Sequence, residues 1–124
     1  MRSIIIILLG VVLAGCATTA KDLRQEDSET WVAQEPIEQV FREYKEYIDN
    51  EIAWSGLLGQ NVGQESHFYG DSAEVAIKMT GNPMGRNTYL YFDLRAQDGA
   101  TKITAWPYNG AWRRKIADFR ALSD

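Results

Sequence analysis

The stretch EVAIKMTGNPMGRNTYLYFDLRAQDGATKITAW, residues 74–106, decides the fold. Apolar and polar residues alternate along it with the period of a half-buried strand, in three segments at 74–80, 88–97 and 101–106. The run at 81–87 is rich in turn-forming residues, and Asp98-Gly99 is typical of a tight hairpin turn. The stretch therefore predicts three antiparallel strands of one sheet.

Helices are predicted on both sides of these strands. Pro36 suits the beginning of a helix because its missing N–H costs nothing there. The apolar residues after it recur at helical spacing, so we expect a helix over residues 36–52. A second apolar stripe predicts a final helix over residues 111–122, through Trp112, Ile116 and Phe119.

A further short strand is predicted at residues 66–70, ahead of the other three. Residues 53–63 contain three glycines and no clear period, and they predict an irregular connector. The resulting order is helix, four-stranded antiparallel sheet, helix, which is an α+β fold. Each helix and the sheet have one apolar side, so we expect two layers, with the helices covering Val75, Leu90 and Ile103.

By the same alternation, the other side of the sheet presents aromatic residues beside an arginine, namely Tyr69, Tyr89, Tyr91, Trp106 and Arg95. Exposed apolar patches commonly mark contacts, and Tyr, Trp and Arg are favoured anchors. Equally, Tyr and Trp suit strands and pack on one another. Arg86, in the loop at 81–87, is a candidate contact for an anion, although the loop also suits a purely structural role.

The first sixteen residues, MRSIIIILLGVVLAGC, have the organisation of a secretory signal peptide. Arg2 precedes an apolar run at 4–13, which is about half of the ~20 residues needed to span a bilayer. Leu-Ala-Gly-Cys at 13–16 then resembles the lipobox of bacterial lipoproteins, where cleavage falls before the cysteine. An ordinary signal peptide needs no cysteine at this place, and Cys16 is the only cysteine in the chain.

The lipobox resemblance implies that Cys16 carries a diacylglycerol on its thiol and an acyl chain, such as palmitate, on its amine. In lipoproteins, an aspartate directly after the cysteine tends to retain the protein in the inner membrane. This chain has Ala17 at that position, so the resemblance implies the outer membrane, and we expect the protein on its periplasmic side. The expected organisation is a signal peptide at 1–15, a lipidated cysteine with a flexible tether at 16–34, and one domain at 35–124.

A second resemblance covers about half of the chain. The run from Phe68 to Ile103, with its Asn-Pro-Met-Gly-Arg-Asn loop, is similar to a group of small, uncharacterised bacterial lipoproteins that share a helix and a hairpin-rich sheet. Some members carry extra cysteines near the end of the helix, which this chain lacks. The group implies a fold and no activity.

No residue pattern predicts catalysis or metal binding. His67 is the only histidine, and the neighbouring Ser66 would face the opposite side of a strand. Neither Ser66 nor Ser72 lies in a Gly-x-Ser-x-Gly turn. One histidine and no second cysteine exclude the usual zinc sites. We therefore expect no enzyme, no metal and no cofactor beyond the acyl groups, with a hydrolase based on His67 as a minor alternative.

Charge is unevenly distributed. Without residues 1–15 the chain carries 12 basic and 17 acidic residues, a net charge of −5 that makes it a poor candidate for nucleic-acid binding. The acidic residues gather in 21–51. Arg113, Arg114 and Lys115 begin a predicted helix, where the helix dipole disfavours cations. We expect the acidic first helix to lie alongside them; the alternative is an anionic partner such as lipid headgroups.

The leading functional hypothesis is a lipid-anchored cell-envelope module without catalytic activity, which holds a protein partner or cell-wall glycan on the Tyr/Trp side of its sheet. The alternative is a carrier of a small apolar ligand. Its pocket would lie between the helix and the sheet, under the apolar residues Trp54, Leu57 and Leu58.

Overall fold

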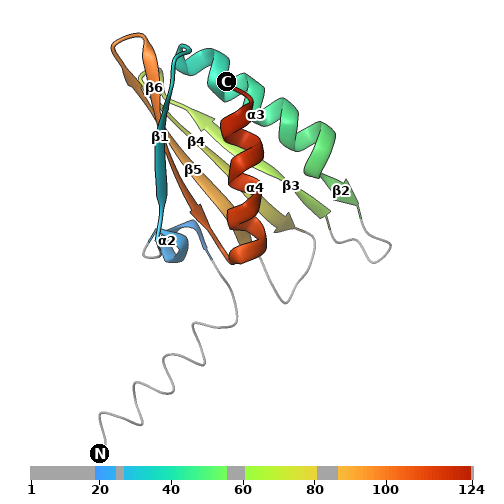
Figure 1. Cartoon of the computed structure of the whole chain (residues 1–124). Helices are drawn as coiled ribbons and strands as arrows, with labels where there is room; N and C mark the ends of the chain where they lie inside the picture. The colour runs from blue at the N-terminus through green and yellow to red at the C-terminus, as the bar shows by residue number, and fades with distance from the viewer. Residues whose placement is uncertain (1–18, 25–26, 56–60, 81–86, 124) are drawn as a thin grey trace, which may run out of the picture.

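The computed structural model describes residues 19–24, 27–55, 61–80 and 87–123. They form a six-stranded antiparallel sheet in the order β1-β6-β5-β4-β3-β2 (Figure 1). The strands are β1 (Glu29–Ala33), β2 (Trp54–Ser55), β3 (Asn61–Phe68), β4 (Ser72–Thr80), β5 (Thr88–Gln97) and β6 (Ala100–Pro107). Strands β2 to β5 each pair with the next strand along the chain, and β1 pairs with the far side of β6.

Helices α3 (Ile37–Tyr47) and α4 (Gly110–Ala121) lie over the same face of this sheet (Figure 1). Helix α3 continues into a π-helical turn, η1 (Ile48–Ile52). Helix α4 begins at Gly110 because the side chain of Asn109 accepts a hydrogen bond from the backbone N–H of Trp112, at 3.0 Å. None of the described helices is long and apolar enough to cross a membrane.

An aromatic cluster joins both helices to the sheet. Phe92 of β5 lies 5.1 Å from Tyr44 of α3 and 4.6 Å from Phe119 of α4, measured between ring centroids. All three residues are fully buried. The residues expected beneath the helices are buried as well, namely Val75, Leu90 and Ile103. The predicted covering of this face is therefore confirmed.

A third, short helix lies on the opposite face, which we call the open face. This helix, α2 (Ala20–Leu23), begins with a capping box in which Thr19 and Asp22 exchange hydrogen bonds. Its Leu23 is only 1% exposed and packs with Ala76 and Tyr91 of the sheet. Helix α2 thus fastens the beginning of the described chain to the open face.

The α+β class and the antiparallel sheet are confirmed, but the count of four strands is wrong. Strand β1 and helix α2 arise from the segment expected to be a flexible tether at 16–34, whose residues 16–18 and 25–26 lie outside the described part. Strand β2 and the beginning of β3 arise from the predicted connector at 53–63. In β1, Trp31 and Ala33 are buried in the core beneath the helices, which explains why this short segment joins the sheet.

We predict that Leu23→Ala lowers the free energy of unfolding by about 2–3 kcal/mol, because it removes a buried side chain from between α2 and the sheet. Urea denaturation of the purified protein measures this change. Val32→Ala is the control, since Val32 is 48% exposed and its truncation should cost about 0.5 kcal/mol or less. Equal effects of the two substitutions would mean that α2 does not pack on the sheet.

Candidate functional site

A β-bulge decides which aromatic side chains reach the open face. Ile77 pairs with Leu90, but the next residue, Lys78, pairs with Thr88, so Tyr89 is the extra residue of β5. The ring of Tyr89 stacks on Trp112 of α4, with centroids 5.2 Å apart and planes 7° from parallel. The prediction that Tyr89 belongs to the open face is therefore wrong.

The other predicted aromatic residues of the sheet lie on the open face but do not form a bare platform. Tyr91 and Trp106 are cross-strand partners whose ring centroids are 5.7 Å apart. Tyr91 is only 5% exposed because Leu23 packs on it, and the guanidinium of Arg24 lies 5.3 Å from its ring centroid. Helix α2 therefore occupies the position that we expected a partner to take.

Tyr69 remains accessible. It follows β3, is 60% exposed, and its ring stacks beside that of His67, with centroids 6.4 Å apart. Arg95 is exposed at the same end of this face, where it pairs with Ser72 of β4 in the strand ladder and forms an ion pair with Asp93 at 2.9 Å. Cys16 and Arg86 lie outside the described residues.

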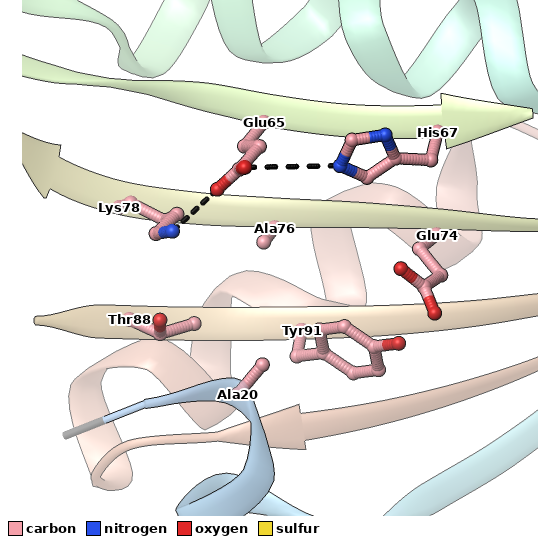
Figure 2. A pocket seen from close by; sticks show the side chains of 8 residues that line it. All are labelled: Ala20, Glu65, His67, Glu74, Ala76, Lys78, Thr88 and Tyr91. Carbon is pink, nitrogen blue, oxygen red and sulfur yellow. Dashed lines mark hydrogen bonds and ion pairs between the residues drawn. The ribbon is translucent and has the colours of Figure 1, made fainter.

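A cavity of about 140 Å³ opens on the open face beside α2 (Figure 2). Strands β3, β4 and β5 supply most of its lining, and α2 supplies one small residue. The lining residues are Ala20, Glu65, His67, Glu74, Ala76, Lys78, Thr88 and Tyr91. The sequence pattern had placed Glu74 and Lys78 on this side of the sheet, but it did not indicate that β3 brings Glu65 and His67 next to them.

Glu65 connects the two basic residues of the cavity. Its carboxylate accepts a hydrogen bond from Lys78 Nζ, and its other oxygen lies 3.7 Å from His67 Nε2 (Figure 2). The hydrogen bond and the charge of Lys78 hold the pKa of Glu65 below its ordinary value. Glu65 therefore remains ionised and orients both neighbours.

Glu74 and Tyr91 form the second polar pair of the cavity. Figure 2 shows the carboxylate of Glu74 near the hydroxyl end of the Tyr91 ring. Burial raises the pKa of Tyr91, and the negative charge of Glu74 raises it further. The phenol therefore keeps its proton and acts as a hydrogen-bond donor.

These side chains suit recognition of a small polar group. The cavity is smaller than the ~300–1,000 Å³ typical of sites for drug-sized ligands, so it accommodates a single projecting group. Its two carboxylates outnumber its one lysine, which favours a group that is cationic or donates hydrogen bonds. No cluster of three or more possible metal ligands occurs among the residues described.

Ser66 and His67 are neighbours in β3, but their side chains lie on opposite faces of the sheet. Ser66 pairs with Val75, on the face covered by the helices, and its hydroxyl donates a hydrogen bond to Gln64. His67 pairs with Glu74 on the open face. The expected separation of Ser66 from His67 is thus confirmed, and the described residues show no serine–histidine pair there.

The interface suggested for an apolar ligand is closely packed. Val40 and Ile48 of α3 are fully buried, and Tyr44 between them contacts both Phe92 and Phe119 through ring edges. Leu57 and Leu58, which would cover such a pocket, lie outside the described residues. This packing gives no support to an apolar ligand site between α3 and the sheet.

The cations at the beginning of α4 have other partners than expected. Arg113 forms an ion pair with Glu29 of β1 at 3.4 Å and donates a hydrogen bond to the backbone oxygen of Asp27 at 3.1 Å. Lys115 pairs with Asp118 within α4, at 3.8 Å. The ion pairs of this cluster are therefore formed not with the acidic first helix, as expected, but with Glu29 of β1 and Asp118 of α4 itself.

Comparison with models of known protein families, with curated proteins and with solved structures found no match. The functional argument consequently rests on the residues of this chain alone.

We predict that Lys78→Met raises the pKa of Glu65 toward its ordinary value, measured by NMR titration of the Glu65 carboxyl. The pair stabilises the fold above the ordinary pKa of a glutamate, and this contribution disappears as the pH falls through the lowered pKa. Because Glu65 is half exposed, the loss at neutral pH should stay below about 1 kcal/mol. Lys102→Met, on the same face but in β6, is the control and should leave the titration unchanged; an unaltered Glu65 in Lys78→Met would contradict the pairing.

Proposed function

We propose that this chain is a lipid-anchored cell-envelope protein and that its domain binds a partner without catalysing a reaction. The lipobox-like residues at 13–16 support acylation of Cys16, and Ala17 supports the periplasmic side of the outer membrane. Two or more acyl chains hold a protein firmly on a bilayer, whereas one chain binds only marginally. The domain then needs no further membrane segment.

The observation that carries the binding role is the asymmetry of the sheet. Its apolar residues lie under α3 and α4, whereas the open face carries a cavity lined by charged and hydrogen-bonding side chains. Glu65, His67 and Lys78 are held in a defined arrangement by mutual contacts. A solvated surface needs no such ordered group, so we assign it to recognition of a partner.

The chemistry of the cavity narrows the class of partner. A lysine side chain of an envelope protein, or the amine and hydroxyl groups of a cell-wall glycan, would meet the carboxylates of Glu74 and Glu65 as acceptors. The exposed ring of Tyr69 beside the cavity offers an additional apolar contact. The partner therefore inserts one polar group and lies against Tyr69.

We predict that Cys16→Ser abolishes membrane retention of the mature protein, either by releasing it in soluble form or by leaving an unprocessed precursor. Membrane fractionation with mass measurement of the intact protein distinguishes these products from the acylated form. Ala17→Ser is the control and should remain acylated and membrane-bound. Unaltered retention and processing of Cys16→Ser would refute the anchor.

We further predict that a photo-crosslinking amino acid at Tyr69 captures the partner in living cells, whereas the same amino acid at Ala117, exposed on α4, does not. Glu74→Gln combined with Glu65→Gln should reduce the Tyr69 adduct several-fold while the protein level stays constant, because the two carboxylate acceptors of the cavity are lost. Mass spectrometry identifies the adduct. An adduct that is unaffected by this double substitution, or one that forms equally from Ala117, would contradict binding at the open face.

A further inference from the structure

One end of the sheet brings together the beginning of the described chain and the beginning of α4. Ala20 lines the same cavity as Thr88, the first residue of β5. The next residue, Tyr89, accepts a hydrogen bond through its backbone oxygen from the N–H of Tyr108, at 2.8 Å, just before α4. In Figure 1, α2 and the beginning of α4 both lie at the end of the sheet opposite the β5–β6 hairpin. We call this the anchor end.

The anchor end carries cations that the described part of the protein does not pair. Helix α4 has no acidic residue in its first turn, where its dipole is positive. Arg113 is balanced by Glu29, but Arg114 in α4 and Lys21 in α2 are exposed and form no ion pair with another described residue. Asp22 and Asp27 at the same end are also exposed and form no ion pair with another described residue, so the attraction to an anionic partner depends on the positions of Lys21 and Arg114 and not on the net charge of this end.

An exposed aromatic residue accompanies these cations. Tyr108 is 47% exposed and, with Asp27, Gly110 and Arg113, borders a second cavity of about 200 Å³. Tyrosine is enriched at the level of lipid headgroups, because its ring is apolar and its hydroxyl is polar. Tyr108, Arg114 and Lys21 thus have the composition of a surface that meets a bilayer.

The position of Cys16 in the chain also indicates that the anchor end lies near the membrane. Cys16 precedes Thr19 by three residues, so their Cα atoms are at most about 11 Å apart. If Cys16 is acylated, as the proposed function requires, the anchor end must lie close to the headgroups. No other end of the sheet is brought near them by the chain.

We infer that the anchor end, through Tyr108, Arg114 and Lys21, docks on the anionic lipid headgroups of the membrane that holds the acyl chains. The sheet then stands away from the bilayer, with the β5–β6 hairpin outermost. The inference deepens the proposed function, on which it rests, by fixing the orientation of the anchored domain.

The test uses the full acylated protein, reconstituted in phosphatidylcholine vesicles with and without phosphatidylglycerol. A fluorescent label is placed on Ala111→Cys, in the first turn of α4, or on Gln97→Cys, at the other end of β5. Cys16 does not compete for the label when its thiol is acylated. Lipids with a nitroxide on the headgroup quench a label that lies near them.

We expect the label at position 111 to be quenched at least about twofold more strongly than the label at 97 in vesicles that contain phosphatidylglycerol. High salt should reduce the difference, because it screens exposed charges. Arg114→Glu with Lys21→Glu should reduce it as well, whereas Arg95→Glu, near the outer end of the sheet, should not.

Each other outcome overturns a distinct claim. Equal quenching of the two labels on acylated protein overturns the docking while leaving the anchor intact. Stronger quenching at 97 means that the opposite end faces the bilayer. A difference that persists without phosphatidylglycerol and in high salt excludes an electrostatic contact with anionic headgroups. An unmodified Cys16, shown by the mass of the intact protein, overturns the proposed function and the orientation together.

Discussion

The packing of Phe92 between two helices is the contact on which the rest of the structure depends. Its ring packs against Tyr44 of α3 and Phe119 of α4, and aromatic side chains of this size bury a large apolar surface in a small core. Because one ring serves both helices, both must lie on the same face of the sheet. The opposite face is then freed from the requirement to be apolar, which is why charged residues can be ordered there without weakening the core.

Local periodicity was enough to predict the elements that contain their own signal. Strands β4, β5 and β6 and helices α3 and α4 each bury several residues at regular spacing, so their boundaries differ from the predicted ranges by only a few residues. Strand β1 has five residues, and its place depends on pairing with β6 some seventy residues later. A segment so short gives no period from which its pairing can be inferred.

The candidate site was less predictable because it depends on three non-local features. The β-bulge at Tyr89 directs its side chain to the face covered by α3 and α4. The alternating pattern of β5 does not predict this bulge. Helix α2 has four residues, too few for a helical period, yet Leu23 covers Tyr91. The position of Glu65 beside Lys78 follows from the length of β3, whose beginning was predicted to be a loop. The alternating pattern thus placed Tyr91, Glu74 and Lys78 on the correct face, but it misplaced Tyr89 and did not predict the group that lines the cavity.

The burial of Leu23 also restricts what the proposed lipoprotein can reach. A mobile tether of some fourteen residues would let the domain explore about 20 Å from the bilayer. Instead Ala20, four residues after Cys16, lines the cavity itself, so its Cα lies within about 15 Å of the acylated cysteine. The side of the cavity formed by Ala20 therefore lies close to the headgroups, whereas His67 and Tyr69 lie further along the open face, toward the β5–β6 hairpin. A partner that reaches both Ala20 and Tyr69 must therefore extend along the open face, from the headgroups outward. The burial of Leu23 against Ala76 and Tyr91 thus determines which part of the open face lies next to the bilayer.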